Sequence, residues 1–334
     1  MDRPIVAVDT MGGDNAPEAP VRGAFEAARS LGARVCLVGD EARIRQFMGD
    51  PDLQRAGLVT IRHAPGVIEA GDQPVAAIRR KKDSSMVVAL NMAAAGEAAA
   101  VVSAGNTGAL MAGGVLFVGR LEGVDRPAIS TVLPTQEGSG VLLLDAGANT
   151  DVRPDHLAQF AAMGATYVER VLGWKPARVA LLNIGTEESK GNEAARQAYG
   201  LLKTRSDFAG NIEARDVLSG SVNVVVCDGF AGNVFLKTIE GVVEMIFSGL
   251  KAEVTRDLLS KAGAALLRPA FRRLKGRLDY SEYGGAPLLG LKKACIKCHG
   301  SSGSRAIMNG IRVAVEFSRS GAIEALAAEL AGSA

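Results

Sequence analysis

Short apolar runs alternate along the chain with longer segments whose apolar residues recur at helical spacing. Between residues 154 and 172 the apolar side chains recur every three or four positions, which is typical of a helix packed on one face. The pattern predicts strands at 5–8, 34–38, 58–62, 99–102, 128–133, 141–144, 179–183, 222–227 and 294–297. It predicts helices at 17–31, 74–96 with a break near Asp83, 109–121, 154–172, 192–204, from Asn233 onward and at 302–317.

The predicted strands are near-continuous in Val and Leu, and helices separate most of them. Strands of this kind are buried on both faces, which favours a mostly parallel sheet covered by helices on each side. We therefore expect a Rossmann-like, layered αβα fold. No Pro/Ser-rich linker divides the chain, so we expect a single α/β unit over 1–334. One excursion, at 241–285, lacks strand signals and is expected to be a helical hairpin.

Composition and charge exclude few functions but narrow the choice. The chain has 334 residues, 48% of them hydrophobic, which is ample for a large core. A net charge of +2 and the lack of interleaved basic and aromatic residues give no reason to expect a nucleic acid partner. The first residues enter a predicted strand directly, without the pattern of a secretion signal, so we expect a cytoplasmic protein.

The run from 98 to 119 carries no charge and is long enough to span a bilayer. However, a Gly-rich turn at 103–108 interrupts it, and such a turn exposed to lipid would leave backbone groups unpaired. We favour a buried strand, a tight loop and a buried helix.

Several loops that follow predicted strands are rich in Gly, Asn and Asp. In α/β sheets, ligands bind at the carboxyl ends of strands, and Gly-rich helix starts bind anions through unpaired N–H groups. Each loop alone also fits an ordinary turn or helix cap. If they converge at one sheet edge, as we expect, an anion site is favoured. The loops are 9–15, 103–108, 145–149, 185–192, 228–233 and 299–302.

Two other patterns bear on whether the protein binds a cofactor or a metal. The turns at 101–108 and 225–232 both read V-V-x-x-G-x-x-G, which is neither a Walker motif nor the full dinucleotide fingerprint, so a nucleotide is possible but not indicated. Cys295-x-x-Cys298-His299 matches the haem-attachment string, but that chemistry needs an exported chain. A zinc site would need further ligands nearby. A redox pair is less easily excluded, although its position at a strand end is unlike the helix start that lowers a thiol pKa.

The loops, taken in order, resemble the PlsX family of phosphate acyltransferases. The likeness rests on residues 8–14, 103–111, 145–149 with 153–157, 181–185 with 190–193, 227–233 and 299–302. Thr10, Ala146 and Ala231 depart from the expected pattern, and Ala231 has no hydroxyl with which to bind substrate. The Cys pair also looks unlike the family, which suggests that these cysteines are incidental.

The resemblance implies a fold similar to phosphotransacetylases and to isocitrate/isopropylmalate dehydrogenases, and a homodimer with its cleft near the interface. It implies acyl-carrier protein as donor, inorganic phosphate as acceptor and acyl-phosphate as product for phospholipid synthesis. It further implies a protein at the inner face of the cell membrane, next to a membrane glycerol-3-phosphate acyltransferase. Neither a metal nor an organic cofactor is required. Two rivals remain: a phosphotransacetylase-like or metal-dependent dehydrogenase, and a membrane-surface scaffold that carries acyl groups without catalysis.

On this reading the phosphate lies at the Gly-bounded turn 103–108, and His299 is suited to hydrogen bonding or proton transfer near neutral pH. The catalytic candidates are His299, Asn106, Lys190, Asn233 and Asp228. The candidates for binding substrate and phosphate are Ser103, Gly105, Asn106, Thr107, Gly108, Asp9, Gly12, Gly13, Asp14, Asp145, Asn149 and Gly232.

The excursion contains both apolar and basic residues. Between residues 251 and 280 there are eight basic residues and three acidic ones. That mixture suits a segment lying on an anionic membrane surface. We expect Pro269 to end or bend one of its helices. A hairpin that packs in a dimer with a solvated basic face is nearly as well supported. The residues expected to touch lipid are Leu266, Leu267, Arg268 and Phe271.

Overall fold

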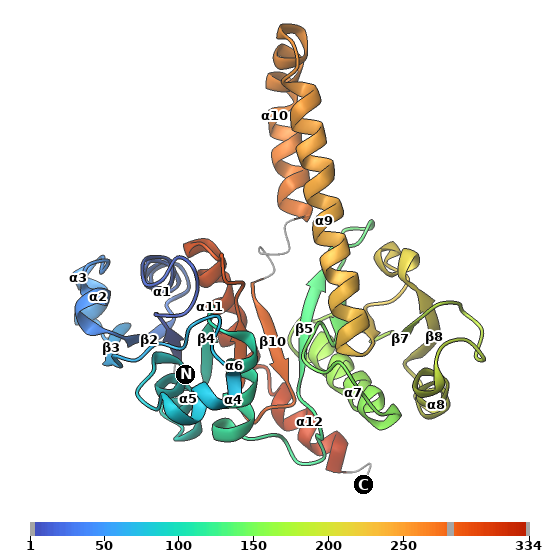
Figure 1. Cartoon of the computed structure of the whole chain (residues 1–334), viewed down its shortest axis with the longest axis horizontal. Helices are drawn as coiled ribbons and strands as arrows, with labels where there is room; N and C mark the ends of the chain where they lie inside the picture. The colour runs from blue at the N-terminus through green and yellow to red at the C-terminus, as the bar shows by residue number, and fades with distance from the viewer. Residues whose placement is uncertain (1–3, 279–283, 332–334) are drawn as a thin grey trace.

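The computed structural model describes residues 4–278 and 284–331 (Figure 1). Over that part the strands form an 11-stranded sheet in the order β3-β2-β1-β4-β11-β10-β5-β6-β9-β7-β8. The strands are β1 Ile5–Asp9, β2 Arg34–Gly39, β3 Val59–His63, β4 Ala100–Ser103, β5 Ala128–Leu133, β6 Val141–Leu144, β7 Val179–Asn183, β8 Phe208–Glu213, β9 Val224–Val226, β10 Ala286–Leu289 and β11 Ala294–Lys297. The helices are α1 Glu18–Leu31, α2 Glu41–Arg45, α3 Pro51–Arg55, α4 Pro74–Arg80, α5 Ser85–Ala94, α6 Thr107–Gly113, η1 Gly114–Val118, α7 Pro154–Arg170, α8 Glu193–Leu202, η2 Ala214–Ser219, α9 Gly229–Val254, α10 Leu258–Leu278, α11 Ser304–Arg319 and α12 Ala322–Ala331.

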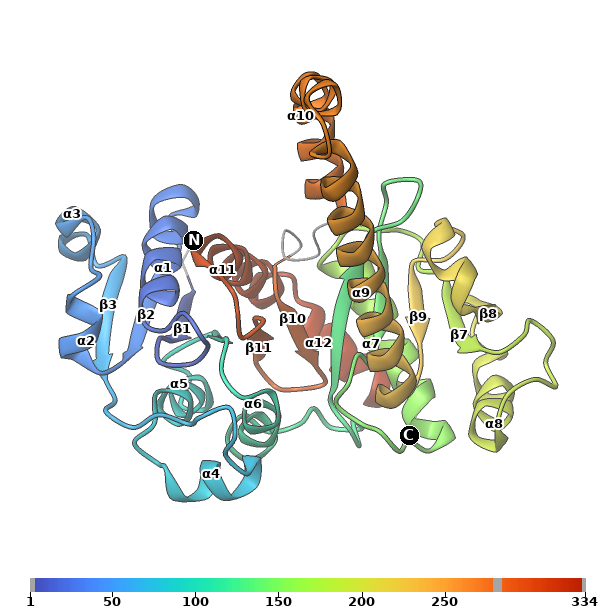
Figure 2. The same cartoon turned by 45° about the horizontal axis from the view of Figure 1, so that its top comes forward.

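Helices cover both faces of the sheet, as predicted. Successive strand residues point to opposite faces, so Val6 and Val8 pack with α1 and α11 while Ala7 packs with α5 and α6. Figure 2 shows α1 and α11 on one side of the strands and α4, α5 and α6 on the other. The near-continuous apolar strands follow from burial on both faces.

The two halves of the sheet run in opposite directions. Strands β1, β2, β3, β4 and β11 are mutually parallel, but β10 is antiparallel to both β11 and β5, and β5 is antiparallel to β6. Strands β6, β9, β7 and β8 therefore run against the first half. The prediction that all six loops meet at one sheet edge is wrong, because this reversal places the carboxyl ends of the halves at different edges.

Most predicted elements are present, and the exceptions have physical reasons. The strands β5, β6, β7 and β11 have the predicted bounds. The edge strand β8 was missed because its sequence mixes polar residues with Gly210, and β10 was missed because Pro287 argues against a strand. Helix α12 was not predicted. Helix α9 begins at Gly229 and not at Asn233, and the predicted helix 109–121 is α6 followed by the π-helical η1.

The uncharged run at 98–119 forms β4, the tight loop and α6, as favoured from the sequence. Within the described residues, no helix has both the length and the apolar character needed to cross a bilayer.

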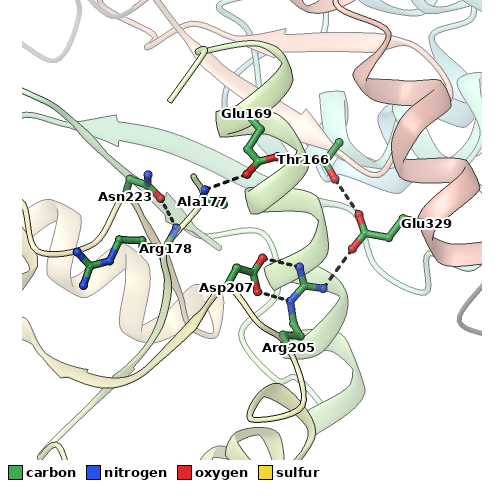
Figure 3. Close-up of polar contacts among 8 residues, drawn as sticks. All are labelled: Thr166, Glu169, Ala177, Arg178, Arg205, Asp207, Asn223 and Glu329. Carbon is green, nitrogen blue, oxygen red and sulfur yellow. Dashed lines mark hydrogen bonds and ion pairs between the residues drawn. The ribbon is translucent and has the colours of Figure 1, made fainter. Parts of the chain in front are cut away.

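Helix α12 is attached to the body by polar contacts (Figure 3). Thr166 Oγ1 of α7 donates to Glu329 of α12 at 3.0 Å, and Arg205 Nη1 donates to the same carboxylate at 3.2 Å. Arg205 also donates to Asp207 through Nε and Nη2, at 2.9 and 2.8 Å. These contacts join α7, the segment before β8 and the last helix.

Helices α9 and α10 form a hairpin that projects away from the sheet (Figure 1). The first turns of α9 pack Phe235, Leu236 and Ile239 against the core. Pro269 lies inside α10 and does not end it, so of the two predicted effects only a bend of the helix stays a prediction. The side chains at 275, 277 and 278 and all of 279–283 lie outside the described residues.

Candidate active site

Asp9, at the end of β1, organises the loops of the first half of the sheet. Its buried carboxylate accepts from Ser85 Oγ and Ser103 Oγ, both at 2.6 Å, and from the Met11 N–H. Burial raises the pKa of Asp9, and these hydrogen bonds oppose the rise. Asp9 and Ser103 are therefore hydrogen-bonded to each other, and their side chains hold the loop.

Two glycines let three loops of this half approach closely. A Cβ on Gly12 would lie 2.7 Å from the backbone nitrogen of Gly105, and Gly13 has a φ of 100°, which side chains rarely adopt. The Asp14 N–H donates to the carbonyl oxygen of Gly300 at 2.8 Å. The loops 9–15, 103–108 and 299–302 thus form one cluster.

Asp145 organises the loops of the other half. Its buried carboxylate accepts from the N–H groups of Ile129, Gly147, Ala148 and Asn149 and from Asn149 Nδ2. Burial raises the pKa of Asp145, and the hydrogen bonds lower it in part.

The loop 228–233 packs directly on the loop of Asp145. A Cβ on Gly232 would collide with the carbonyl oxygen of Asp145, so only glycine permits this approach. Asp228 caps α9 by accepting from the Ala231 N–H at 2.7 Å. The loops 145–149 and 228–233 form a second cluster.

A cavity of about 350 Å³ lies between the two clusters, across the face of β5 and β10. Its polar lining combines Thr107 and His299 from the first half with Gly147 and Asn233 from the second. Thr131 of β5 and Leu236 of α9 add to the wall. The reversed halves of the sheet therefore bring three of the predicted residues, Thr107, His299 and Asn233, together across a face and not along an edge. We call this space the reaction cavity.

His299 is held in one orientation within the reaction cavity. Its Nδ1 accepts the Ser301 N–H at 3.2 Å and lies 2.8 Å from Ser301 Oγ. Because Nδ1 accepts, the proton of the neutral ring is on Nε2, which is then a donor available to a ligand.

Lys297 was missed by the sequence analysis and also lines the reaction cavity. Its Nζ donates to the carbonyl oxygens of Ala104 and Cys298, beside the turn 103–108. Burial lowers the pKa of Lys297, while Cys298, Asp9 and Asp14 raise it. The sequence signal that could have found Lys297 is its position at the end of a predicted strand, two residues before His299. Only the cysteines of the segment 295–299 were interpreted.

The chain is similar to known proteins over nearly its whole length. The model of a family of fatty acid synthesis proteins matches residues 5–325. A phosphate acyltransferase of Bacillus licheniformis is 50% identical, over 93% of this chain and 94% of that protein. A phosphate acyltransferase of Geobacillus thermodenitrificans is 51% identical, over 97% of this chain and 98% of that protein.

The chain belongs to this family. It is an acyltransferase that forms acyl-phosphate in the synthesis of fatty acids and phospholipids. Two solved structures share its fold. One is a phosphotransacetylase from Streptococcus pyogenes, with a TM-score of 0.62, 16% identity and coverage of 95% of this chain and 94% of that one. The other is a branched-chain phosphotransacylase from Enterococcus faecalis, with a TM-score of 0.57, 14% identity and coverage of 94% and 99%.

Three predicted catalytic residues of this family member do not lie with His299 in the reaction cavity. Asn106 caps α6 through the Ala109 N–H, and its Nδ2 donates to the carbonyl oxygens of Ala70 and Asp72. Asp228 lines a different cavity, of about 930 Å³, beyond the second cluster. Lys190 is exposed on the loop beside that cavity, and its Nζ lies 4.0 Å from Glu187 Oε1. None of the three lines the reaction cavity, and their catalytic roles stay predictions.

The Cys295–Cys298 pair does not have the environment of a reactive pair. Both thiols are buried, and burial raises the pKa of each to about 12. Neither sulfur is therefore a thiolate at neutral pH, and only the thiolate is a nucleophile.

Proposed function

We propose that the acyl group comes from the thioester of an acyl-carrier protein and passes to inorganic phosphate. The observation that supports this best is that the Lys297 ammonium and the His299 imidazole both line the reaction cavity, as does Thr107 at the start of α6. Phosphate is an anion at neutral pH, and a partly desolvated ammonium attracts it more strongly than one in water. The remaining binding candidates, Asp9, Gly12, Gly13, Asp14, Asp145, Asn149 and Gly232, hold the loops that shape the cavity.

In this proposal a phosphate oxygen attacks the thioester carbonyl carbon while Lys297 and the N–H groups of Thr107 and Gly108 hold the phosphate. A carbon–oxygen bond forms and the carbonyl oxygen takes the negative charge. Asn233 stabilises that oxyanion. The carbon–sulfur bond then breaks, and His299 Nε2 donates its proton to the departing thiolate. The products are acyl-phosphate and the free thiol of the carrier.

The hairpin is the feature that supports binding of the protein to the inner face of the cell membrane. Leu258 and Leu259 at its turn are each 84% exposed, and Leu266 is 85% exposed. Exposed apolar side chains beside basic ones suit an anionic lipid surface. A protein held there could pass acyl-phosphate to a membrane glycerol-3-phosphate acyltransferase. A homodimer with the cavity near its interface belongs to the same proposal.

The test is phosphate-dependent release of free carrier protein, measured with purified enzyme, acyl-carrier protein and inorganic phosphate. We expect turnover to require phosphate and the KM for the carrier to rise with salt, because carrier proteins are acidic. Equal use of acyl-CoA, or no effect of salt, would contradict the assignment of the donor. A non-catalytic scaffold would release no carrier, and a dehydrogenase would bind NAD in a titration.

A further inference from the structure

A third cavity, of about 490 Å³, lies at the start of α7 and has no part in the reaction described above. Arg120, Arg126 and Arg153 line it, with Asp125 as the acidic lining residue and His156 at its wall. We call it the basic cavity. Three guanidinium groups against one carboxylate leave an excess of positive charge, which favours an anion.

The polar groups of the basic cavity are only partly satisfied within the part of the chain that the structure describes. Arg153 Nη2 pairs with Asp125 Oδ2 at 2.7 Å, and Arg120 donates to the carbonyl oxygens of Val124 and Asp125. Arg126 is exposed and forms no ion pair with any described residue. At least one guanidinium is therefore free to take up a ligand.

His156 supplies an independent observation. It is 2% exposed, and its Nδ1 accepts the Arg153 N–H at 3.1 Å. The proton of the neutral ring is therefore on Nε2, and that buried atom has no hydrogen-bond partner among the described residues. Asp125 Oδ2 lies 3.7 Å away, beyond hydrogen-bond distance. Burial and the Arg153 guanidinium lower the pKa of His156, which keeps the ring neutral.

The basic cavity also lies next to the reaction cavity. Gly147 lines the reaction cavity, and the following residues Ala148 and Asn149 line the basic one. On α6, Thr107 lines the first and Met111 the second, about 6 Å apart along the helix axis. The π-helical turn η1, a form common at functional sites, supplies Val115.

We propose that the basic cavity binds a phosphate group distinct from the one that reacts. The Asp125 carboxylate, half exposed, now occupies the place that this anion would take between Arg153 and His156. Two sources share the chemistry: the phosphodiester in the thiol arm of a carrier protein, and free inorganic phosphate. The first source rests on the proposed function; the second does not.

The experiment compares 4′-phosphopantetheine, pantetheine and inorganic phosphate by isothermal titration calorimetry on the full-length protein. Arg126→Ala removes a cation that forms no ion pair with a described residue. Asp125→Asn removes the competing carboxylate and leaves the hydrogen bond from the Asp125 backbone N–H to Gln159 Oε1 possible. Arg178→Ala, an exposed arginine directly before β7, is the charge-matched control. We expect phosphopantetheine to bind more tightly than pantetheine. That preference should fall about tenfold in Arg126→Ala, rise several-fold in Asp125→Asn and persist in Arg178→Ala.

The outcomes separate the sources. A preference for phosphopantetheine that depends on Arg126 supports the carrier arm. Loss of one inorganic phosphate site in Arg126→Ala, with no such preference, supports free phosphate. The proposal is overturned if no probe distinguishes the wild type from Arg126→Ala and Asp125→Asn. Binding is read without turnover, so failure of the carrier-release assay would refute the proposed function and leave this result standing.

Discussion

At the scale of single residues, the structure separates side chains that hold loops from side chains that face a cavity. The first kind forms hydrogen bonds with nearby backbone and hydroxyl groups, as do Asp9, Asp145 and Asn106. His299 and Lys297 instead line the reaction cavity. Sequence motifs contain both kinds, because a loop that must present a ligand also needs residues that fix its shape.

His299→Ala should reduce kcat by about 100-fold, because it removes the one ring donor that lines the reaction cavity. Circular dichroism and the melting temperature should match the wild type, since His299 is exposed. His63→Ala is a control, because His63 lies at the end of β3 on the far side of the sheet. Near-normal turnover of folded His299→Ala would rule out a catalytic role.

Lys297→Met should raise the KM for phosphate at least tenfold, because it removes the partly buried cation and keeps most of the length of the side chain. The pKa of Lys297 is lowered in the folded state, so below that pKa the fold bears the cost of a desolvated ammonium, and this cost disappears as the pH rises through it. Relative to the wild type, Lys297→Met should therefore gain more stability at pH 7, where this cost is present, than at pH 10, where it has largely disappeared. Urea unfolding at pH 7 and pH 10 measures this. An unchanged KM for phosphate would refute the assignment.

At the scale of elements, the hairpin of α9 and α10 has exposed apolar side chains that packing within one chain does not explain. Its base is buried against the core, but Leu258, Leu259, Leu266 and Leu267 are exposed. Such apolar surface on a projecting element indicates a partner surface, either lipid or a second protein. The sequence alone identified the excursion because it lacks strand signals and is rich in basic residues.

Replacing Leu266 and Leu267 with Glu should abolish co-sedimentation with anionic liposomes at moderate salt, because carboxylates are repelled and resist burial in lipid. Turnover in the soluble assay should persist. Leu201→Glu, on an exposed position of α8, should change neither property. Undiminished sedimentation would refute membrane contact here. Loss of a dimer in size-exclusion chromatography would instead assign these leucines to subunit packing.

At the scale of the whole molecule, distant parts of the chain depend on each other. Arg205 connects the segment before β8 to Asp207 and to Glu329 of the last helix (Figure 3). Helix α12 also packs Leu326 and Leu330 into the core. The C-terminal helix is thus part of the body, although its sequence did not predict it.

Arg205→Ala should lower the free energy of unfolding by about 1–3 kcal/mol, because the partly buried Asp207 carboxylate loses both of its hydrogen bonds from Arg205 and Glu329 loses one of its contacts. Arg22→Ala removes an ion pair with Glu18 whose two side chains are 61% and 53% exposed, and it should cost less than about 0.5 kcal/mol. Guanidinium unfolding measures both. Equal effects of the two substitutions would show that the contacts of Arg205 add no stability.

The sequence by itself determined nine of the eleven strands in the described part of the chain, most helices, the polar loops and the family. The spacing of apolar residues shows which faces of a segment are buried. All four residues of β6 are apolar, which indicates a strand covered by helices on both faces, and all four are buried. The hairpin and the residues His299, Asn233 and Thr107 were also predicted, because long motifs carry them in order.

Only the tertiary structure decided which of these residues meet. The antiparallel strands β10 and β5 reverse the second half of the sheet, and Pro287 hides β10 from any local pattern. That reversal places Asn233 opposite His299, removes Lys190 and Asp228 from the reaction cavity and brings in Lys297. It also creates the basic cavity from Arg120, Arg126 and Arg153. The physical reason is that a side chain's partners come from strands far apart in the sequence, and only the pairing of those strands sets the distance between them.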